Sequence, residues 1–198
     1  MSPRPRKVTD EQLLAAALAL MNRVGPNELT LAAIAREAGV TPAVLVQRFG
    51  SKRNLLLALS QKFSDASSEM VTVLARQHAS PLAAIRAYAE CVAGMAATPA
   101  AFVRNLAYLQ TDLTDAEFRR HLAKHARATR AGLRRLLEGA IRAGELVSDT
   151  PAGRLARTVE AVVSGSMLTW VVYQEGSAIR WVRADLEAVL GPYLKRSG

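Results

Sequence analysis

The sequence predicts an all-α protein of about nine helices, arranged as a small N-terminal three-helix head and a larger C-terminal helical bundle. Apolar residues recur at helical spacing along most of the chain, whereas the alternation typical of β-strands is rare. Half of the residues are apolar but only 5% are aromatic. Ala, Leu, Val and Arg dominate, and most of these side chains lose little entropy in a helix, so the composition favours packed helices over sheets.

Capping residues, glycines and prolines indicate where the helices begin and end. Thr9 and Gln12 form a capping-box pattern, and Pro42 stands at a first helical position, where its missing N–H costs nothing. No internal repeat and no low-complexity linker interrupts the pattern. The expected helices cover residues 9–25, 30–39, 41–50, about 100–110, 115–143, 151–174 and 179–195, with one more beginning at Ser51 and one between Pro81 and Pro99.

The net charge of +9 and the pI near 10.4 favour polyanionic partners such as nucleic acid or an anionic membrane surface. Cys91 is the only cysteine, so no intramolecular disulfide forms, and a reducing compartment is expected. The N-terminus has no apolar signal region, and the uncharged stretch of residues 161–173 is too short to span a bilayer. We therefore expect a soluble, cytoplasmic protein with no membrane partner.

The segment Leu29–Phe49 has the pattern of a helix-turn-helix. A first helix ends at Gly39-Val40, and a second, short helix follows directly. Ile34 and Leu45 are placed to form the small core that fixes the two helices. In such a motif the second helix enters the DNA major groove, with its N-terminal residues toward the base edges.

The outer face of this second helix carries side chains suited to DNA. Gln47 can pair with adenine in a bidentate manner, and the methyl groups of Ala43 and Val44 can contact thymine methyl groups. Arg48 and Lys52 lie where phosphates would pass, and hydroxyls at helix N-termini suit phosphate oxygens. The candidate DNA-binding residues are Thr30, Thr41, Pro42, Ala43, Val44, Gln47, Arg48 and Lys52, with Arg4 and Arg6 from a basic N-terminal arm. That arm fits either DNA contact or a solvated tail.

The segment from Leu29 to Leu56 closely resembles the DNA-binding domain of TetR-family regulators. The matching features are the Thr30 cap, the Ile34-Ala35 pair, the run Ala38-Gly39-Val40-Thr41, Phe49, and Ser51-Lys52 before Leu55-Leu56. One departure is the sequence Val46-Gln47-Arg48, where the family often has an aromatic residue followed by His or Tyr. The resemblance implies a helix-turn-helix DNA-binding domain over residues 1–51 and a ligand-binding and dimerisation domain over residues 52–198.

The resemblance also implies a homodimer through the helices around residues 152–174 and 179–195, although the same apolar faces could close the core of a single chain. An effector pocket is expected among the fifth to eighth helices, with an apolar lining and a few polar groups. Methionine and aromatic side chains at helical spacing are also typical of ordinary core. The candidate ligand-binding residues are Met95, Phe102, Leu106, Tyr108, Leu109, Gln110, Met167, Trp170 and Tyr173.

Catalytic and metal-binding patterns are weak. His121 and His125 are four residues apart, one turn after Glu117, a spacing that can hold a metal. Neighbouring Arg and Lys residues would repel a cation, so this stretch is interpreted as a solvated helix face. The sequence has no phosphate-binding glycine loop, no nucleophile elbow and no paired cysteines. We therefore expect no metal, no cofactor and no enzymatic activity.

These observations together predict a ligand-responsive regulator of transcription. The resemblance favours a repressor that leaves a palindromic double-stranded DNA operator when a small, largely apolar effector binds the C-terminal domain. The alternatives are a helical module that binds a small molecule without specific DNA binding, and a cofactor-free helical enzyme.

Overall fold

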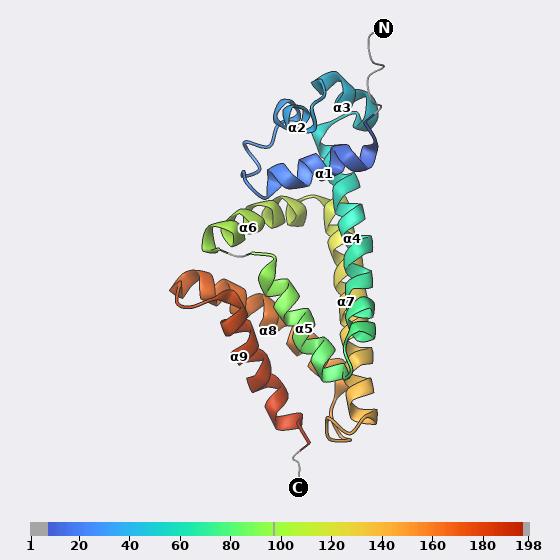
Figure 1. The fold of residues 1–198 in the computed structure, drawn as a ribbon, viewed down its shortest axis with the longest axis vertical. Helices are drawn as coiled ribbons and strands as arrows, with labels where there is room; N and C mark the ends of the chain where they lie inside the picture. The colour runs from blue at the N-terminus through green and yellow to red at the C-terminus, as the bar shows by residue number, and fades with distance from the viewer. Residues whose placement is uncertain (1–7, 97, 196–198) are drawn as a thin grey trace. The chain divides into compact units, whose positions relative to one another are not determined.

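The computed structural model describes residues 8–96 and 98–195 of the protein, and over these residues it is all-α (Figure 1). The nine helices expected from the sequence are all present in this part of the chain, and no strand is. They are α1 Asp10–Met21, α2 Leu31–Ala38, α3 Pro42–Phe49, α4 Lys52–Gln77, α5 Pro81–Gly94, α6 Pro99–Thr114, α7 Ala116–Arg142, α8 Ala152–Tyr173 and α9 Ala178–Leu190, followed by a short 3-10 helix, Gly191–Tyr193.

Three helix ends differ from the sequence expectation. Helix α1 ends at Met21 instead of residue 25, and α6 continues to Thr114 instead of about residue 110. Helix α9 ends at Leu190 instead of residue 195, and the chain tightens into the 3-10 turn. Pro192 explains this last difference, because it has no N–H with which to continue the α-helical hydrogen bonds.

Contacts divide the chain into two units, and the division differs from the boundary expected after residue 51. The head unit contains residues 8–63 and 104–119, and the body unit contains residues 64–103 and 120–195. The first half of α4 and the junction of α6 with α7 therefore pack with the three N-terminal helices. Sequence patterns alone do not show this arrangement, because residues 104–119 are remote from the head in the chain.

The head unit is organised around one apolar cluster. Leu13, Ile34, Leu45 and Leu55 come from four different helices, and each side chain is fully buried. The expected capping box begins α1: the Thr9 hydroxyl accepts the N–H of Gln12 at 3.2 Å, and the Gln12 side chain accepts the N–H of Thr9 at 2.9 Å. The short helices are therefore held in place mainly by burial of their apolar sides.

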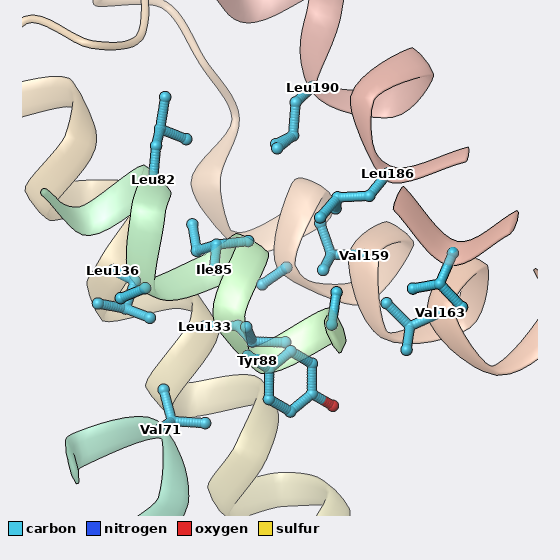
Figure 2. Close-up of a cluster of buried hydrophobic side chains, with 14 of the residues drawn as sticks. Val71, Leu82, Ile85, Tyr88, Leu133, Leu136, Val159, Val163, Leu186 and Leu190 are labelled. Carbon is cyan, nitrogen blue, oxygen red and sulfur yellow. The ribbon is translucent and has the colours of Figure 1, made fainter. Parts of the chain in front are cut away.

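The body unit has a larger core, contributed mainly by α5, α7, α8 and α9 (Figure 2). Ile85, Leu133, Val159 and Leu190 are fully buried in it. A bidentate pair joins α5 to α9, because Arg86 donates to both carboxylate oxygens of Glu187 at 2.6 and 3.0 Å. Arg86 also lowers the pKa of Glu187, so the carboxylate is held in its charged form.

Within residues 8–96 and 98–195, α8 is the one helix that is long and apolar enough to cross a membrane, judged by its length and composition alone. Its inner side belongs to the body core, where Leu155, Val159, Val163 and Trp170 are buried. Its outer side keeps Leu168 and Val172 exposed, at 50% and 72%. The hydropathy of α8 is therefore that of a core helix with a second apolar face.

One close helix contact lies at Gly132 of α7, against Val71 of α4. A β-carbon at Gly132 would approach a methyl carbon of Val71 to 2.9 Å, closer than real side chains pack. We predict that Gly132→Ala lowers the free energy of unfolding by about 1–3 kcal/mol, measured by urea denaturation.

Gly153→Ala is the matched control on α8, because no heavy atom lies within 4 Å of the added carbon. That variant should stabilise the protein by up to about 1 kcal/mol, since alanine favours a helix. Equal effects of the two substitutions would contradict the packing described here.

Candidate DNA-binding site

The turn between α2 and α3 depends on a glycine with positive φ. Gly39 has a φ of 66°, a left-handed conformation that other residues adopt at a cost. The N–H of Val40 then donates to the carbonyl of Ala35 at 2.9 Å and closes the end of α2. Ile34 and Ala35 on one side of the turn and Leu45 on the other are buried, as the sequence predicts for a helix-turn-helix.

The exposed face of α3 contains most of the residues expected to contact bases. Thr41, Pro42, Ala43 and Gln47 are exposed. The hydroxyl of Thr41 makes no capping hydrogen bond, so both its lone pairs and its proton are available to a ligand. These four residues form a surface whose polar and apolar groups can contact base edges in the DNA major groove.

Two valines of α3 are placed differently from the sequence expectation. Val44, expected on the outer face, is half-buried and packs against the head core. Val46, absent from the predicted contacts, is 48% exposed. Val46 is adjacent to Gln47, and it is exposed because its neighbour Leu45 points into the core. Once Leu45 is assigned to the core, the helical period therefore predicts that Val46 lies on the exposed side.

Thr30 and Lys52 already have partners within the head unit. The Thr30 hydroxyl accepts the N–H of Ala33 at 3.1 Å, which confirms the expected cap of α2 and leaves the hydroxyl proton available. The Lys52 ammonium donates to the carbonyl of Pro26 at 2.8 Å, and burial lowers its pKa. Contact of either residue with phosphate remains a prediction.

Arg48 is held by the start of α1. Its guanidinium donates to Asp10 Oδ1 at 2.7 Å and to the carbonyl of Val8 at 3.1 Å. The Arg48 side chain remains 33% exposed, and that of Asp10 remains 55% exposed. Arg48 therefore lies at the surface as the phosphate hypothesis requires, but an internal carboxylate competes for its charge.

The C-terminal part of α6 is attached to the end of α1. The Tyr108 hydroxyl donates to the carbonyl of Val24 at 2.9 Å, and Arg104 donates to the carbonyl of Asn22 at 3.2 Å. Asn22 is the C-cap of α1 and Val24 lies two residues further on, so these donors hold the segment that directly follows α1. The hydroxyl of Tyr108 is therefore bonded within the head unit, and its role in an effector pocket stays a prediction.

Arg53 of α4 joins the head to the beginning of α7. It donates to both oxygens of Asp115 at 2.8 and 2.9 Å and to Glu117 at 3.1 Å, and it lies over the Phe118 ring. Arg53 lowers the pKa of Asp115 to about 2, so the pair persists throughout the physiological pH range. No local pattern predicts this contact, because the partners are more than 60 residues apart in the chain.

The remaining candidate ligand-binding residues are divided between the two units. Leu106, Leu109 and Gln110 belong to the head unit, whereas Met95, Phe102, Met167, Trp170 and Tyr173 belong to the body unit. Met167 and Trp170 are buried in the body core, and Met95 and Tyr173 are each 60% exposed. The two candidate basic residues of the N-terminal arm, Arg4 and Arg6, lie outside the described residues.

The histidine pair on α7 also differs from its sequence interpretation. His121 and His125 are half-buried, not solvated, and Glu117 pairs with Arg53. In the part of the chain that the structure describes, no group of three His, Cys, Asp or Glu side chains is placed to hold a metal ion. A solvated face was expected because Arg and Lys residues surround the two histidines in the sequence. Those charged residues lie on the outer side of the helix, whereas the histidines lie on its inner side.

Comparisons with known families cover most of the chain. Residues 13–59 match the family described as "Bacterial regulatory proteins, tetR family". Residues 81–186 match the family described as "Tetracyclin repressor-like, C-terminal domain". A search of curated proteins gives no match.

Solved structures share this fold over nearly the whole chain. A TetR transcription regulator from Haloarcula marismortui is 16% identical with a TM-score of 0.78, covering 94% of this chain and 98% of its own. The reduced form of E. coli NemR is 20% identical with a TM-score of 0.78, covering 96% and 100%. Bacillus subtilis FadR in complex with stearoyl-CoA is 16% identical with a TM-score of 0.68, covering 91% and 97%.

The pair between Asp10 and Arg48 leads to a testable prediction. Asp10→Asn should release Arg48 for a phosphate, so the logarithm of DNA affinity should fall more steeply with the logarithm of salt concentration, by about 0.9 for one added phosphate contact. Fluorescence anisotropy with a fixed DNA duplex at several salt concentrations measures this slope.

Glu11→Gln provides the control, because it removes the same charge one residue further along α1. It should raise affinity only through the change in net charge and leave the slope near that of the unmodified protein. If both substitutions change the slope equally, Asp10 does not compete for Arg48.

Proposed function

Because this chain belongs to the TetR family of bacterial regulatory proteins, we propose that it acts as a homodimer that binds a twofold-symmetric operator and leaves it when a small molecule binds. The family places the protein among DNA-binding regulators of transcription with a helix-turn-helix. Repression, the apolar character of the effector and a cytoplasmic location are parts of this proposal. Regulators of this family are generally not enzymes, and we infer the same for this chain.

The exposed face of α3 and its N-cap is the observation that carries the proposal. Thr41, Ala43 and Gln47 are exposed, while Leu45 on the opposite side is fully buried in the head core. A recognition helix needs this combination, because burial fixes its orientation while the free face contacts base edges. Gln47 is the one residue of this set with paired donor and acceptor groups, so we assign it the main base contact.

A second apolar face in the body unit supports a homodimer. The outer side of α8 has small or apolar residues at helical spacing, and all are exposed: Ala161, Ser164, Gly165, Leu168 and Val172. A β-carbon at Gly165 would meet no heavy atom within 4 Å, so a second helix can approach closely at that point. A second copy of this chain fits the face, because a twofold operator requires two recognition helices about 34–36 Å apart.

The body unit is the proposed location of the effector. FadR from B. subtilis has the same fold and is in complex with stearoyl-CoA, which supports binding of a molecule with a long apolar chain by this architecture. Helices α4, α6 and α7 each contribute residues to both units. A ligand that displaces these helices in the body would therefore change the head, with a coupling of about 1–3 kcal/mol, or 5–150-fold in operator affinity.

Selection of binding duplexes from random DNA, followed by anisotropy titration of the tightest one, tests DNA recognition. We predict tight, salt-sensitive binding that Gln47→Ala weakens by about 1–3 kcal/mol on the selected duplex but not on random DNA. The reason is that Gln47 contributes to base discrimination and not to the charge of the protein.

Gln77→Ala is the matched control, because Gln77 is an exposed glutamine at the end of α4 in the body unit. This substitution should leave both affinities unchanged. Equal affinity for selected and random duplexes, with no effect of Gln47→Ala, would show that the protein does not recognise sequence through α3.

The dimer hypothesis is tested by Leu168→Glu. A carboxylate in the middle of an apolar interface would be desolvated without a partner, so we predict dissociation to monomers at micromolar concentration. Sedimentation velocity measures the mass of the particle in solution. Val73→Glu, at a similarly exposed valine of α4 (43% exposed), should leave the dimer intact, and a dimer that persists in Leu168→Glu would exclude this face.

A further inference from the structure

Three buried polar atoms lie along one side of α7 without a hydrogen-bond partner. They are Nδ1 of His121, Nδ1 of His125 and Oγ1 of Thr129. The residues are spaced four apart, so their side chains share one face of the helix. Buried polar groups in proteins are nearly always paired, and a set of unpaired groups on one face indicates a site for water or a ligand.

Thr129 provides the strongest evidence among the three. It is only 2% exposed. Two other helical threonine hydroxyls of the body unit bond to the carbonyl four residues earlier, Thr158 to Arg154 and Thr169 to Gly165. The Thr129 hydroxyl makes no such bond, so its polar group is available to a molecule in the interior.

Tyr88 of α5 and Glu160 of α8 lie close to the same region. Glu160 accepts a hydrogen bond at 2.7 Å from Arg130, which follows Thr129 on α7. Tyr88 packs in the same core cluster as Leu133, one turn further along α7. The charge of Glu160 acts to raise the pKa of both Tyr88 and His125. Tyr88 is 6% exposed, and in Figure 2 its hydroxyl points away from the labelled apolar side chains. Burial raises the pKa of Tyr88 to about 12 and lowers the pKa of His125, so both side chains are neutral at physiological pH.

Along α7, the buried apolar residues of the body core end where this polar stripe begins. From Leu133 onward the inner side of α7 contributes only apolar residues to that core, including Leu137 and Ala140. The preceding turns, from His121 to Thr129, contribute none of the buried apolar residues of the cluster. The interior therefore has an apolar part that continues into a polar part along one helix.

Two of the charged side chains of α7 beside the stripe are paired. Lys124 donates to Asp65 at 3.0 Å, and Arg130 donates to Glu160 at 2.7 Å. A charged ligand group that bonded to these buried atoms would lose its hydration, which is unfavourable. A neutral hydroxyl or carbonyl would instead find both donors and acceptors in the hydroxyl and imidazole groups.

We propose that His121, His125, Thr129 and Tyr88 form the polar end of a binding site for an uncharged molecule with an apolar body and a hydroxyl or carbonyl group. This inference rests on the proposed function, since the site would be that of the effector, and it adds the chemical class of the ligand. The ligand's polar group bonds to the unpaired atoms, while its apolar body lies toward the core around Leu133.

Calorimetric titration of the full-length protein with four small aromatic probes tests the proposal. The probes are para-cresol with a hydroxyl, acetophenone with a carbonyl, toluene with neither, and para-toluate with a negative charge. We expect para-cresol and acetophenone to bind with dissociation constants of about 1 mM or below, as their size permits. Toluene and para-toluate should bind at least about fivefold more weakly, because one neutral hydrogen bond is lost or a charge is buried.

Thr129→Val separates recognition from folding, because valine has the same shape without the hydroxyl. We expect this variant to have a higher melting temperature, since an unpaired buried group is removed, and roughly fivefold weaker binding of para-cresol. Thr158→Val on α8 is the control, because that hydroxyl is exposed and bonded to Arg154, and it should leave probe affinity unchanged.

Three outcomes would overturn the proposal: no binding of para-cresol or acetophenone, equal binding of toluene, or unchanged binding in Thr129→Val. The first of these would mean that water alone fills the site. The titrations contain no DNA, so they are independent of the proposed function. If para-cresol binds as expected but no ligand of this class changes operator affinity, the binding site is supported and the proposed regulation by a ligand is contradicted.

Discussion

Burial of Leu45 in the head core is the interaction on which the rest of the head depends. Helix α3 has only eight residues, too few to be stable alone in water, so packing against α1 and α2 determines both its existence and its orientation. The left-handed Gly39 permits that packing by turning the chain sharply between α2 and α3. Because one side of α3 is fixed inside the core, the opposite side is presented as a rigid surface, and this is the surface that we propose contacts the bases.

The head is also built from segments far along the chain. Tyr108 and Arg104 bond to the end of α1, and Arg53 pairs with Asp115 at the start of α7. These contacts explain why the head unit includes residues 104–119. The head unit and the body unit are therefore not separated by a single boundary in the chain, because three helices contribute residues to both.

Local signals in the sequence were sufficient to predict the helices and the motif. The capping box at Thr9, the cap at Thr30 and the glycine at position 39 each act within a few residues, and the structure confirms them. Contacts between distant segments could not be predicted in this way. The pairing of Arg48 with Asp10, the attachment of Tyr108 to Val24 and the burial of His121 and His125 depend on tertiary packing, and charged neighbours concealed the inner side of α7.

Hydroxyl-radical footprinting of the tightest selected duplex tests most directly the central claim that two copies of α3 read one operator. The account predicts two protected patches on one side of the duplex, centred about 34–36 Å apart or at a multiple of that helical repeat. A single protected patch, or uniform protection along the DNA, would contradict it.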